Sequence, residues 1–305
     1  MSATVIDTPS HDSFLAALKS VADQVEAALD RLLPVPTGHH AVVAEAMRYA
    51  ALGGGKRLRP FLVVETARML GGNMEQALHV GCALECLHVY SLVHDDLPCM
   101  DDDDLRRGKP TVHKVYGDAM AVLAGDGLLT HAFELLAAEA AHPDPSVRAR
   151  LVMELAKAGG TSGMIGGQVV DITVSESVRD TALITQLQSM KTGALIRYAT
   201  KAGGLISGAA PHDLAALDQY ADALGLAFQI QDDVLDVEGD VETVGKAVGK
   251  DEDLGKATFV SLLGLNAAKE KAQSLGEEAK AALAPYGEKA QTLRGTVDFV
   301  LKRQH

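Results

Sequence analysis

The sequence predicts an all-α fold, and three observations carry that prediction. Hydrophobic residues make up 47% of the chain but aromatics only 4%, with no Trp, so the core must be built from Ala, Leu and Val. That mixture favours helices over strands. Apolar residues recur at helical spacing, as at Leu15, Leu18, Val21 and Val25. Proline then ends the pattern, as Pro34 does here.

The same periodicity divides the chain into elements. A first helix over residues 12–33 is expected to cover the core without taking part in chemistry. The Gly-rich segment 159–167 is expected to kink or to pack closely against a neighbour. A helix over 181–206 contains Thr192 and Gly193, both weak helix formers, so either a bend facing a ligand or a plain kink is expected. The other helices are expected over residues 39–51, 61–70, 74–96, 118–140, 146–160, 212–237 and 257–303.

Length and charge bound the class of protein. With 305 residues, no internal repeat and no convincing linker, residues 1–305 are expected to form a single domain. The formal net charge of -13 argues against nucleic acid and anionic membranes as partners. An anionic substrate would need metal ions and local cations to offset that charge.

Cysteine usage and the apolar runs point to the cytoplasm. Three cysteines, an odd number, without an N-terminal basic region and cleavage site, predict free thiols in a reducing cytosol. Cys82 and Cys86 lie one helical turn apart and are interpreted as core residues, because no second Cys/His pair has zinc spacing. No apolar run is judged to approach the roughly 18 residues of a membrane span, so a soluble protein is expected.

The first functional signal lies between His88 and Arg107. A helical pattern ends in Asp95-Asp96, a Leu-Pro pair breaks it, and four more aspartates follow before two arginines. Such acidic blocks are usually solvated loops. Carboxylates are also the ligands that Mg²⁺ prefers, and guanidinium groups clamp phosphate oxygens, so a metal and diphosphate site is favoured. His88 shares a helix face with Ser91 and Asp95, and a site role or a plain core role suits it equally.

A second cationic signal spans residues 53–60. Three glycines precede Lys56 and Arg59, and glycine lets the backbone approach a ligand closely. The spacing is not that of a Walker loop. A glycine helix cap explains the glycines but leaves the cations unexplained, so a second anion site is favoured.

A third signal lies on the predicted helix 212–237. Gln229, Asp232, Asp233 and Asp236 fall at i, i+3, i+4 and i+7, which places an amide and three carboxylates on one face. Like charges so spaced destabilise a helix unless cations arrive. We expect this face and the Asp95 cluster to meet across one cavity. The polar loop 239–255 carries two Gly-Lys pairs that could close over a phosphate.

Together these motifs resemble the trans-prenyl diphosphate synthases, and within them the bacterial short-chain farnesyl diphosphate synthases with two extra residues in the first aspartate motif. The resemblance covers nearly the whole chain. It rests on Gly-Gly-Lys-Arg-Leu-Arg-Pro at 54–60, Asp95-Asp96-x4-Asp101, Arg106-Arg107-Gly108, Lys191-Thr192-Gly193, Phe228-Gln229-x-Gln231-Asp232-Asp233-x-x-Asp236, and the two Gly-Lys pairs.

The resemblance implies a helical bundle around a central cavity and usually a homodimer. It implies that Mg²⁺, about three ions per active site and with Mn²⁺ as an alternative, is bound by Asp95, Asp101 and Asp232. Asp96, Asp233 and Asp236 would reach the ions through water. The allylic diphosphate would be held by Arg106, Lys191 and Lys256, with Thr192, Gln229 and Lys246 completing that side. Isopentenyl diphosphate would be held by Lys56, Arg59, His88, Arg107 and the backbone of Gly55. Lys302 and Arg303 are implied to fold over the site.

The implied reaction is head-to-tail condensation of isopentenyl diphosphate with dimethylallyl and then geranyl diphosphate, with Lys191, Thr192 and Gln229 nearest the chemistry. Tyr90 stands five residues before Asp95, about 7 Å along a helix, where it could floor the hydrocarbon pocket. Ser91, beside it, is small. In relatives an aromatic at Tyr90 goes with a fifteen-carbon product, so farnesyl diphosphate is favoured over geranylgeranyl diphosphate.

Three other readings stay open. A terpene cyclase would carry an Asn/Ser/Glu metal motif in place of residues 232–236. A non-catalytic subunit typically loses one aspartate motif, and both are present here. A phosphate-binding protein without turnover would need the cations but not carboxylates on two helices.

Overall fold

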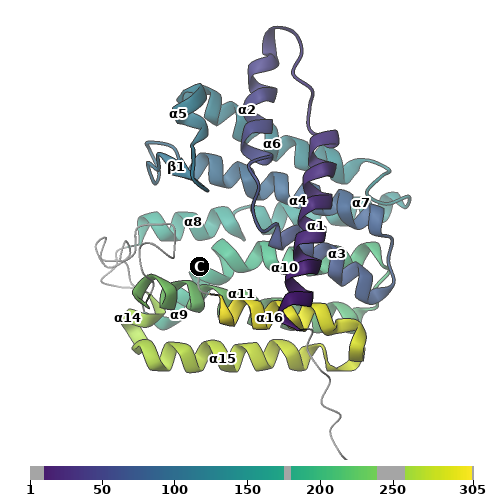
Figure 1. Cartoon of the computed structure of the whole chain (residues 1–305), viewed down its shortest axis with the longest axis vertical. Helices are drawn as coiled ribbons and strands as arrows, with labels where there is room; N and C mark the ends of the chain where they lie inside the picture. The colour runs from purple at the N-terminus through teal and green to yellow at the C-terminus, as the bar shows by residue number, and fades with distance from the viewer. Residues whose placement is uncertain (1–9, 175–179, 239–257, 304–305) are drawn as a thin grey trace, which may run out of the picture. The chain divides into compact units, whose positions relative to one another are not determined.

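The computed structural model describes residues 10–174, 180–238 and 258–303, and these are almost entirely helical (Figure 1). The chain forms two compact units. The N-terminal unit comprises Leu15–Met153 and Leu205–Gly208, and the C-terminal unit comprises the described parts of Met1–Phe14, Glu154–Gly204 and Ala209–His305. The predicted all-α class is confirmed. That residues 1–305 form one domain stays a prediction.

The elements of the N-terminal unit are helices apart from one short hairpin. They are α1 (His11–Leu32), the 3-10 turn η1 (Gly38–His40), α2 (Ala41–Ala51), α3 (Leu58–Leu70), α4 (Met74–Asp95), β1 (Leu105–Arg106), β2 (Lys109–Pro110), α5 (Val112–Tyr116), α6 (Asp118–Ala137) and α7 (Pro145–Gly159). Helices α1 and α7 run on into the other unit.

Helix α4 is the central helix of this unit. Asn73 caps its start, because the side-chain oxygen accepts hydrogen bonds from the backbone N–H groups of Glu75 and Gln76. Between Ala77 and Val93, buried residues lie on nearly every face of α4, and the helix packs against both α3 and α6. A helix that is apolar on every side is held by neighbours on every side. Its end, where the acidic residues begin, is therefore rigidly placed.

The hairpin was not predicted. Strands β1 and β2 pair antiparallel, with Arg106 opposite Lys109, and two residues on each side are too few to give a period-2 pattern in the sequence. The turn residue Arg107 has a φ of 52°, a left-handed conformation that is uncommon outside glycine. The hairpin turns the Arg106 side chain back onto Asp96 of the acidic run, while the Arg107 side chain reaches the Gly54 carbonyl oxygen.

The C-terminal unit is built around one long helix. Its elements are α8 (Met164–Thr173), α9 (Thr181–Gln188), the π-helical turn η3 (Ser189–Gly193), α10 (Ala194–Ile206), α11 (Pro211–Glu238), α14 (Phe259–Leu263), α15 (Leu265–Ala282), the 3-10 segment η4 (Ala284–Ala290) and α16 (Gln291–Lys302). Helix α10 ends in the other unit.

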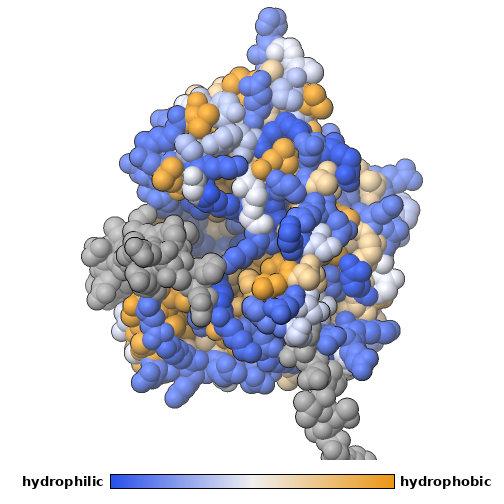
Figure 2. Space-filling model, in the orientation of Figure 1, coloured by the Kyte–Doolittle hydropathy of each residue, from blue (hydrophilic) through white to orange (hydrophobic). Residues whose placement is uncertain are grey.

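Helix α11 packs against α15, α16 and η3. Its buried stripe includes Tyr220, whose hydroxyl donates to the Leu293 carbonyl oxygen at 2.8 Å. Ile230 and Val234 form a core cluster with Phe259 at the start of α14. On the face shown in Figure 2, hydrophilic side chains predominate over the described residues, as the net charge of -13 leads one to expect.

Most predicted helices are confirmed with shifted ends, one is interrupted, and α5 and α8 were not predicted. The helix expected over 181–206 is interrupted by the π-helical turn η3 at the position of the predicted irregularity, and whether this turn faces a ligand stays a prediction. The helices expected over 257–303 are α14, α15, η4 and α16 in the described part, and glycines with positive φ stand between or within them at 264 and 287. Cys82 and Cys86 are buried and free, as predicted, and Cys99 is free and exposed.

The expectation that no segment is long and apolar enough to span a membrane needs one correction. Helix α6 has 20 residues and is apolar enough to meet the length and composition of a span. Core helices of water-soluble proteins meet the same test, and α6 packs against α4, α2 and α5. Length and composition alone therefore do not assign α6 to a membrane.

Candidate functional site

The loop after α4 folds the acidic run back onto the helix end. Asp95 is the last residue of α4, and its carbonyl oxygen accepts a hydrogen bond from the Asp101 backbone N–H at 2.8 Å. The Met100 and Asp102 N–H groups both bond to the Leu97 carbonyl oxygen, which closes the turn. The backbones of two aspartates separated by six positions are thus brought together. Hard oxygen ligands so grouped suit Mg²⁺.

Asp96 has a different role from its neighbour Asp95. It is 3% exposed, and its Oδ1 accepts from Arg106 Nε at 2.7 Å, with Arg106 Nη2 at 2.5 Å from the same oxygen. Burial raises the pKa of Asp96, and Arg106 opposes that rise. Burial also disfavours charge on Arg106, but Asp96 and Asp103 more than offset it, so the pKa of Arg106 is raised. The pair anchors the hairpin to the end of α4.

Arg59 and His88 meet between α3 and α4. The Arg59 Nη1 atom lies 3.2 Å from His88 Nε2. Burial lowers the pKa of His88 well below its ordinary value, and the positive charges of Arg59, Arg107 and Arg106 lower it further. A neutral imidazole can accept a hydrogen bond from the guanidinium through Nε2. His88 therefore orients a cation, which the sequence left as one of two readings.

The glycines at 54 and 55 receive the side chain of Arg107. Arg107 Nη1 donates to the Gly54 carbonyl oxygen. Gly55 has a φ of 127°, and a Cβ added there would lie 2.7 Å from the guanidinium carbon of Arg107. Only glycine fits at that position. Gly55 and its neighbour Lys56 are both exposed. An anion could therefore reach them from solvent, as the predicted anion site requires.

Arg57 holds this loop in place and was not singled out from the sequence. Its guanidinium bonds to Glu85 Oε1 at 2.6 Å, Glu26 Oε2 at 2.5 Å and the Ala51 carbonyl oxygen at 2.5 Å. The residue is 3% exposed. Breaking such a buried pair leaves an uncompensated charge and is strongly destabilising. Among the cations of 56–59, the sequence could not indicate which one points inward.

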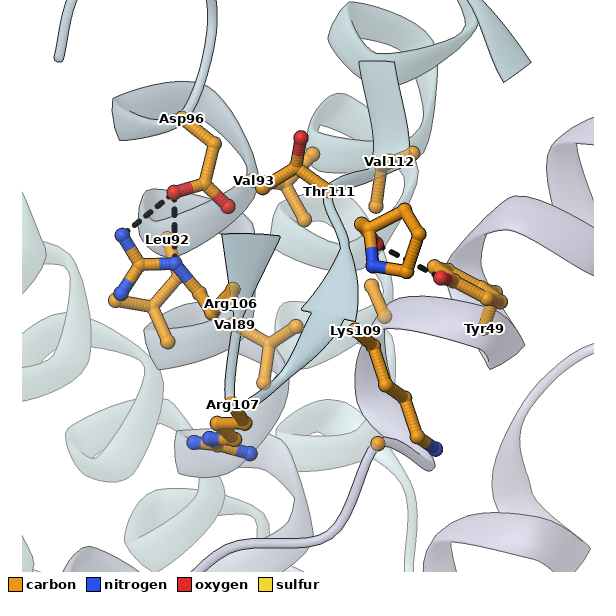
Figure 3. A pocket seen from close by; sticks show the side chains of 13 residues that line it. Tyr49, Val89, Leu92, Val93, Asp96, Arg106, Arg107, Lys109, Thr111 and Val112 are labelled. Carbon is orange, nitrogen blue, oxygen red and sulfur yellow. Dashed lines mark hydrogen bonds and ion pairs between the residues drawn. The ribbon is translucent and has the colours of Figure 1, made fainter. Parts of the chain in front are cut away.

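A cavity of about 460 Å³, counting its open mouth, lies beside these groups (Figure 3). One wall is apolar and comes from α4, through Val89, Leu92 and Val93. The Asp96–Arg106 pair and Lys109 of the hairpin also line the cavity. The lining also includes Tyr49, Ala50, Gly53, Arg107, Pro110, Thr111 and Val112. An apolar wall with cations at its rim suits an amphiphilic anion.

In the C-terminal unit, a chain of polar contacts joins the π-helical turn to α11. The Thr192 hydroxyl donates to Gln229 Oε1 at 3.3 Å, and Gln229 Nε2 donates to Asp233 Oδ1 at 3.3 Å. The other Asp233 oxygen accepts from the Phe259 N–H at 2.8 Å. Asp233 is 5% exposed. It fixes the start of α14, while Thr192 and Gln229 are in direct contact and their role toward a substrate stays a prediction.

Lys191 is paired with a residue that sequence reasoning missed. Its Nζ lies 2.6 Å from Asp171 Oδ2, on α8. Gly167 makes this approach feasible, because a Cβ there would lie 2.4 Å from the Lys191 backbone nitrogen. The close packing predicted for 159–167 is confirmed. The sequence signal for this partner was the spacing of Gln168 and Asp171, which lie at i and i+3 just after the glycines and so share one helix face.

Asp232 faces a cation from the end of the chain. Arg303 Nη2 lies 2.7 Å from Asp232 Oδ1. The same Arg303 nitrogen donates to the Phe228 carbonyl oxygen at 2.7 Å, and the guanidinium carbon lies 3.9 Å from the centroid of the Phe228 ring. Burial lowers the pKa of Arg303, and Asp232 opposes that effect. The position beside Asp232 therefore suits positive charge.

Tyr90 and Ser91 lie on α4 short of its acidic end. Tyr90 is 6% exposed, and its ring meets the His94 ring edge to face at a centroid distance of 5.7 Å. Burial raises the pKa of Tyr90, and Asp95 adds to that rise. The Ser91 hydroxyl donates to the His88 carbonyl oxygen at 2.8 Å. Whether Tyr90 floors a hydrocarbon pocket stays a prediction.

Two predicted site residues, Lys246 and Lys256, lie outside the described residues. The expected meeting of the two acidic motifs concerns both units and also stays a prediction. The donor set fits Mg²⁺ at each motif taken alone. Asp95 and Asp232 are the more exposed members of their pairs, while Asp96 and Asp233 are buried in protein contacts.

The described helices and the two aspartate pairs, each beside basic side chains, define an all-helical protein of the kind that handles diphosphates with divalent metal. The model of the family described as Polyprenyl synthetase matches residues 40–293, and the chain belongs to that family. A farnesyl diphosphate synthase of Geobacillus stearothermophilus is 49% identical over 81% of this chain and 83% of its own length. A geranylgeranyl diphosphate synthase of Cyanophora paradoxa is 41% identical over 89% and 91%. The apo crystal structure of an FPP/GFPP synthase from Zymomonas mobilis superposes with a TM-score of 0.87, at 45% identity over 95% of this chain and 99% of that one.

Proposed function

We propose that this chain is a prenyltransferase that condenses isopentenyl diphosphate with dimethylallyl and then geranyl diphosphate. The products would be (2E,6E)-farnesyl diphosphate and diphosphate. Family membership and the names of its relatives support the class of reaction. The observation that carries the proposal is the division within each aspartate pair. Asp95 and Asp232 stay partly exposed, while Asp96 and Asp233 hold their surroundings rigid.

The allylic substrate must lose its diphosphate, and the site is suited to stabilise that leaving group. Bound Mg²⁺, held by Asp95, Asp101 and Asp232, would neutralise the charge that develops as the C–O bond breaks. Arg106 and Lys191 would bind the same diphosphate. Each is held by a carboxylate at 2.5–2.7 Å, so neither needs to be ordered when substrate arrives.

Isopentenyl diphosphate would bind at the glycine loop. Arg59, oriented by neutral His88, would donate two parallel hydrogen bonds to its phosphates. Arg107, Lys56 and the backbone of Gly55 would complete this anion site. Because the binding groups are cations and backbone, this substrate would need no metal.

The carbocation left by ionisation needs dipoles rather than a base. The Thr192 hydroxyl and the Gln229 carbonyl oxygen are 3.3 Å apart and are suited to face it. The alkene of isopentenyl diphosphate would then attack, and the proton released would go to the departed diphosphate. No protein general base is required in this scheme.

Product length is proposed to be fifteen carbons because Tyr90 is large, buried and rigidly held against His94. Geranylgeranyl diphosphate is the second candidate, and the similarity to a synthase of that product favours keeping it. We also propose that the protein is a homodimer, which light scattering would test, and that it works in the cytoplasm.

Product analysis tests the proposal. The purified full chain would be incubated with Mg²⁺ and labelled isopentenyl diphosphate, with dimethylallyl diphosphate, with geranyl diphosphate, or with no primer. The expected result is a fifteen-carbon diphosphate with either primer and none without. A twenty-carbon main product would replace the first candidate by the second. A cyclic hydrocarbon, or no turnover beside an active relative, would reject the prenyltransferase assignment.

A further inference from the structure

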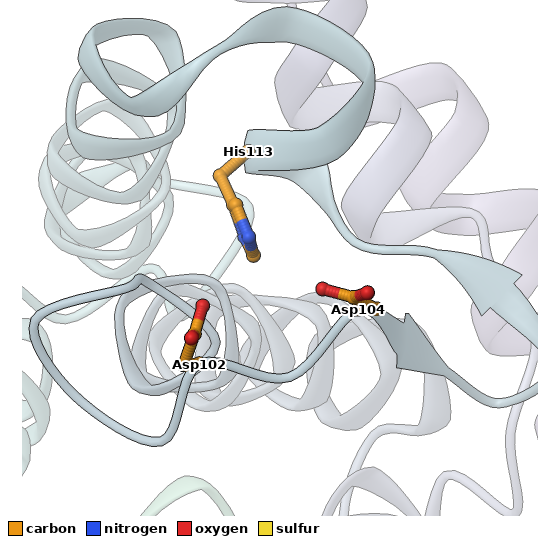
Figure 4. A group of neighbouring side chains, drawn as sticks. All are labelled: Asp102, Asp104 and His113. Carbon is orange, nitrogen blue, oxygen red and sulfur yellow. The ribbon is translucent and has the colours of Figure 1, made fainter.

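Three side chains of the N-terminal unit gather where the loop after α4 meets the start of α5. They are Asp102, Asp104 and His113, and one candidate ligand atom of each lies within 4.8 Å of those of the other two. Figure 4 shows the His113 ring pointing into the space between the two carboxylates. None of these three residues is assigned above to Mg²⁺ or to a diphosphate.

The bonding of His113 leaves one ring nitrogen unused. The residue is 6% exposed, and its Nδ1 lies 3.1 Å from the Thr111 hydroxyl oxygen. The same hydroxyl lies 3.4 Å from the Asp104 carbonyl oxygen, and in the tautomer in which it donates there, Nδ1–H is the donor to Thr111. Nε2 then carries the lone pair. It is buried and, among the described residues, has no hydrogen-bond partner.

An unpartnered buried polar atom is costly, and few native proteins keep one without a reason. The arrangement found here is the one that metal-binding histidines adopt, with the far nitrogen fixed by a hydrogen bond and the near one free to bind. Asp102 and Asp104 are exposed, and each has a carboxylate oxygen within 4.8 Å of a ring nitrogen of His113.

We propose that Asp102, Asp104 and His113 bind a divalent transition metal of the Zn²⁺ class. One imidazole nitrogen and two carboxylate oxygens, completed by water, suit Zn²⁺ better than Mg²⁺, which prefers oxygen alone. Lys114 Nζ lies 2.6 Å from Asp104 Oδ1 and partly neutralises the cluster, leaving Oδ2 for the metal.

Such a metal would join residues 102–104 to the first turn of α5. The hairpin that carries Arg106 and Arg107 lies between these two attachment points in the chain. The metal would therefore act as a clip that steadies the hairpin. This inference does not depend on the proposed reaction.

The test follows the histidine ring nitrogens directly. The full chain, labelled with ¹⁵N-histidine, is titrated with Zn²⁺ alone and observed in long-range ¹H–¹⁵N spectra, with the His113→Gln variant identifying the resonances. One equivalent of Zn²⁺ is expected to shift Nε2 of His113, and millimolar Mg²⁺ is expected not to reverse the shift. Asp104→Asn should weaken Zn²⁺ binding by about tenfold or more, and Lys114→Gln should strengthen it.

Two controls keep the outcome clear. Asp102 and Asp104 are exposed, so their Asn variants should melt like the parent, which circular dichroism checks. Asp95→Asn should leave the His113 shift unchanged, because Asp95 belongs to the other metal set. The proposal is overturned if Zn²⁺ leaves the His113 resonances in place, if both ring nitrogens are protonated at neutral pH, or if Asp102→Asn and Asp104→Asn bind Zn²⁺ as tightly as the parent.

Discussion

Arg303 is predicted to compete with metal for Asp232. The Arg303 guanidinium bonds to Asp232 Oδ1 at 2.7 Å, and the carboxylate must give up that contact to bind an ion through the same oxygen. We therefore expect Arg303→Gln to lower the Mg²⁺ concentration that gives half-maximal activity. Asp232 stays available as a ligand in this variant, so the effect isolates the cost of displacing Arg303.

The magnitude follows from exposure. A fully buried charged hydrogen bond contributes about 1.5–3 kcal/mol. The Asp232 side chain is 42% exposed, so solvent reduces the contact to about 0.5–1 kcal/mol. That free energy corresponds to a decrease of about two- to fivefold in the half-maximal Mg²⁺ concentration.

The assay is a Mg²⁺ titration of turnover at saturating substrates, with Mn²⁺ binding followed by electron paramagnetic resonance as a second readout. Lys302→Gln is the matched control, because it removes the same charge from an exposed neighbour. A Mg²⁺ requirement that is unchanged or raised in Arg303→Gln, or lowered equally in Lys302→Gln, would refute the reasoning.

Three further predictions concern α4. Tyr90→Ala should lengthen the product beyond fifteen carbons, and an unchanged chromatographic profile would reject the floor role. Burial, then the nearby arginines, lower the pKa of His88. The unfolded chain therefore binds more protons, and stability should fall as pH drops below about 6.5. His88→Gln should weaken that dependence, so urea midpoints at pH 5.5 and 7.5 should differ less in the variant. Asp95→Asn should reduce turnover by about a hundredfold or more without lowering the melting temperature. Asp96→Asn should destabilise the fold by about 1–3 kcal/mol, because Arg106 loses its partner. Equal melting curves for the two Asn variants would contradict that division.

Much of the fold could be predicted because the helices are regular. Apolar spacing and chain breakers located most described helices but not α5 and α8, and weak helix formers at Thr192 and Gly193 marked the interruption at η3. The hairpin β1–β2 could not be predicted, because four residues carry no periodicity. Its conformation depends on Arg106 reaching Asp96, a contact between side chains ten positions apart.

The residues of the candidate site were easier to find than their contacts. Charge and spacing singled out Asp95, Asp232 and the cations, because clustered like charges need a reason. The direction in which each side chain points could not be predicted from charge and spacing. Arg57 and Arg59 are two positions apart on one motif, yet Arg57 is buried against Glu85 while Arg59 faces His88. Which arginine turns inward depends on acids elsewhere in the chain, and pairing of that kind leaves no local pattern.

The two aspartate pairs illustrate what a repeated acid contributes. A single carboxylate at a helix end can move with its rotamer, and a metal site needs ligands placed to within about 0.5 Å. In both pairs the second carboxylate is buried and bonded to a neighbouring segment: Asp96 to Arg106 of the hairpin, and Asp233 to the Phe259 N–H at the start of α14. The first carboxylate is thereby attached to a backbone that cannot rotate away. The doubling of Asp is explained in each unit by one acid that anchors and one that is presented, so neither Asp of a pair should be able to compensate for the loss of the other.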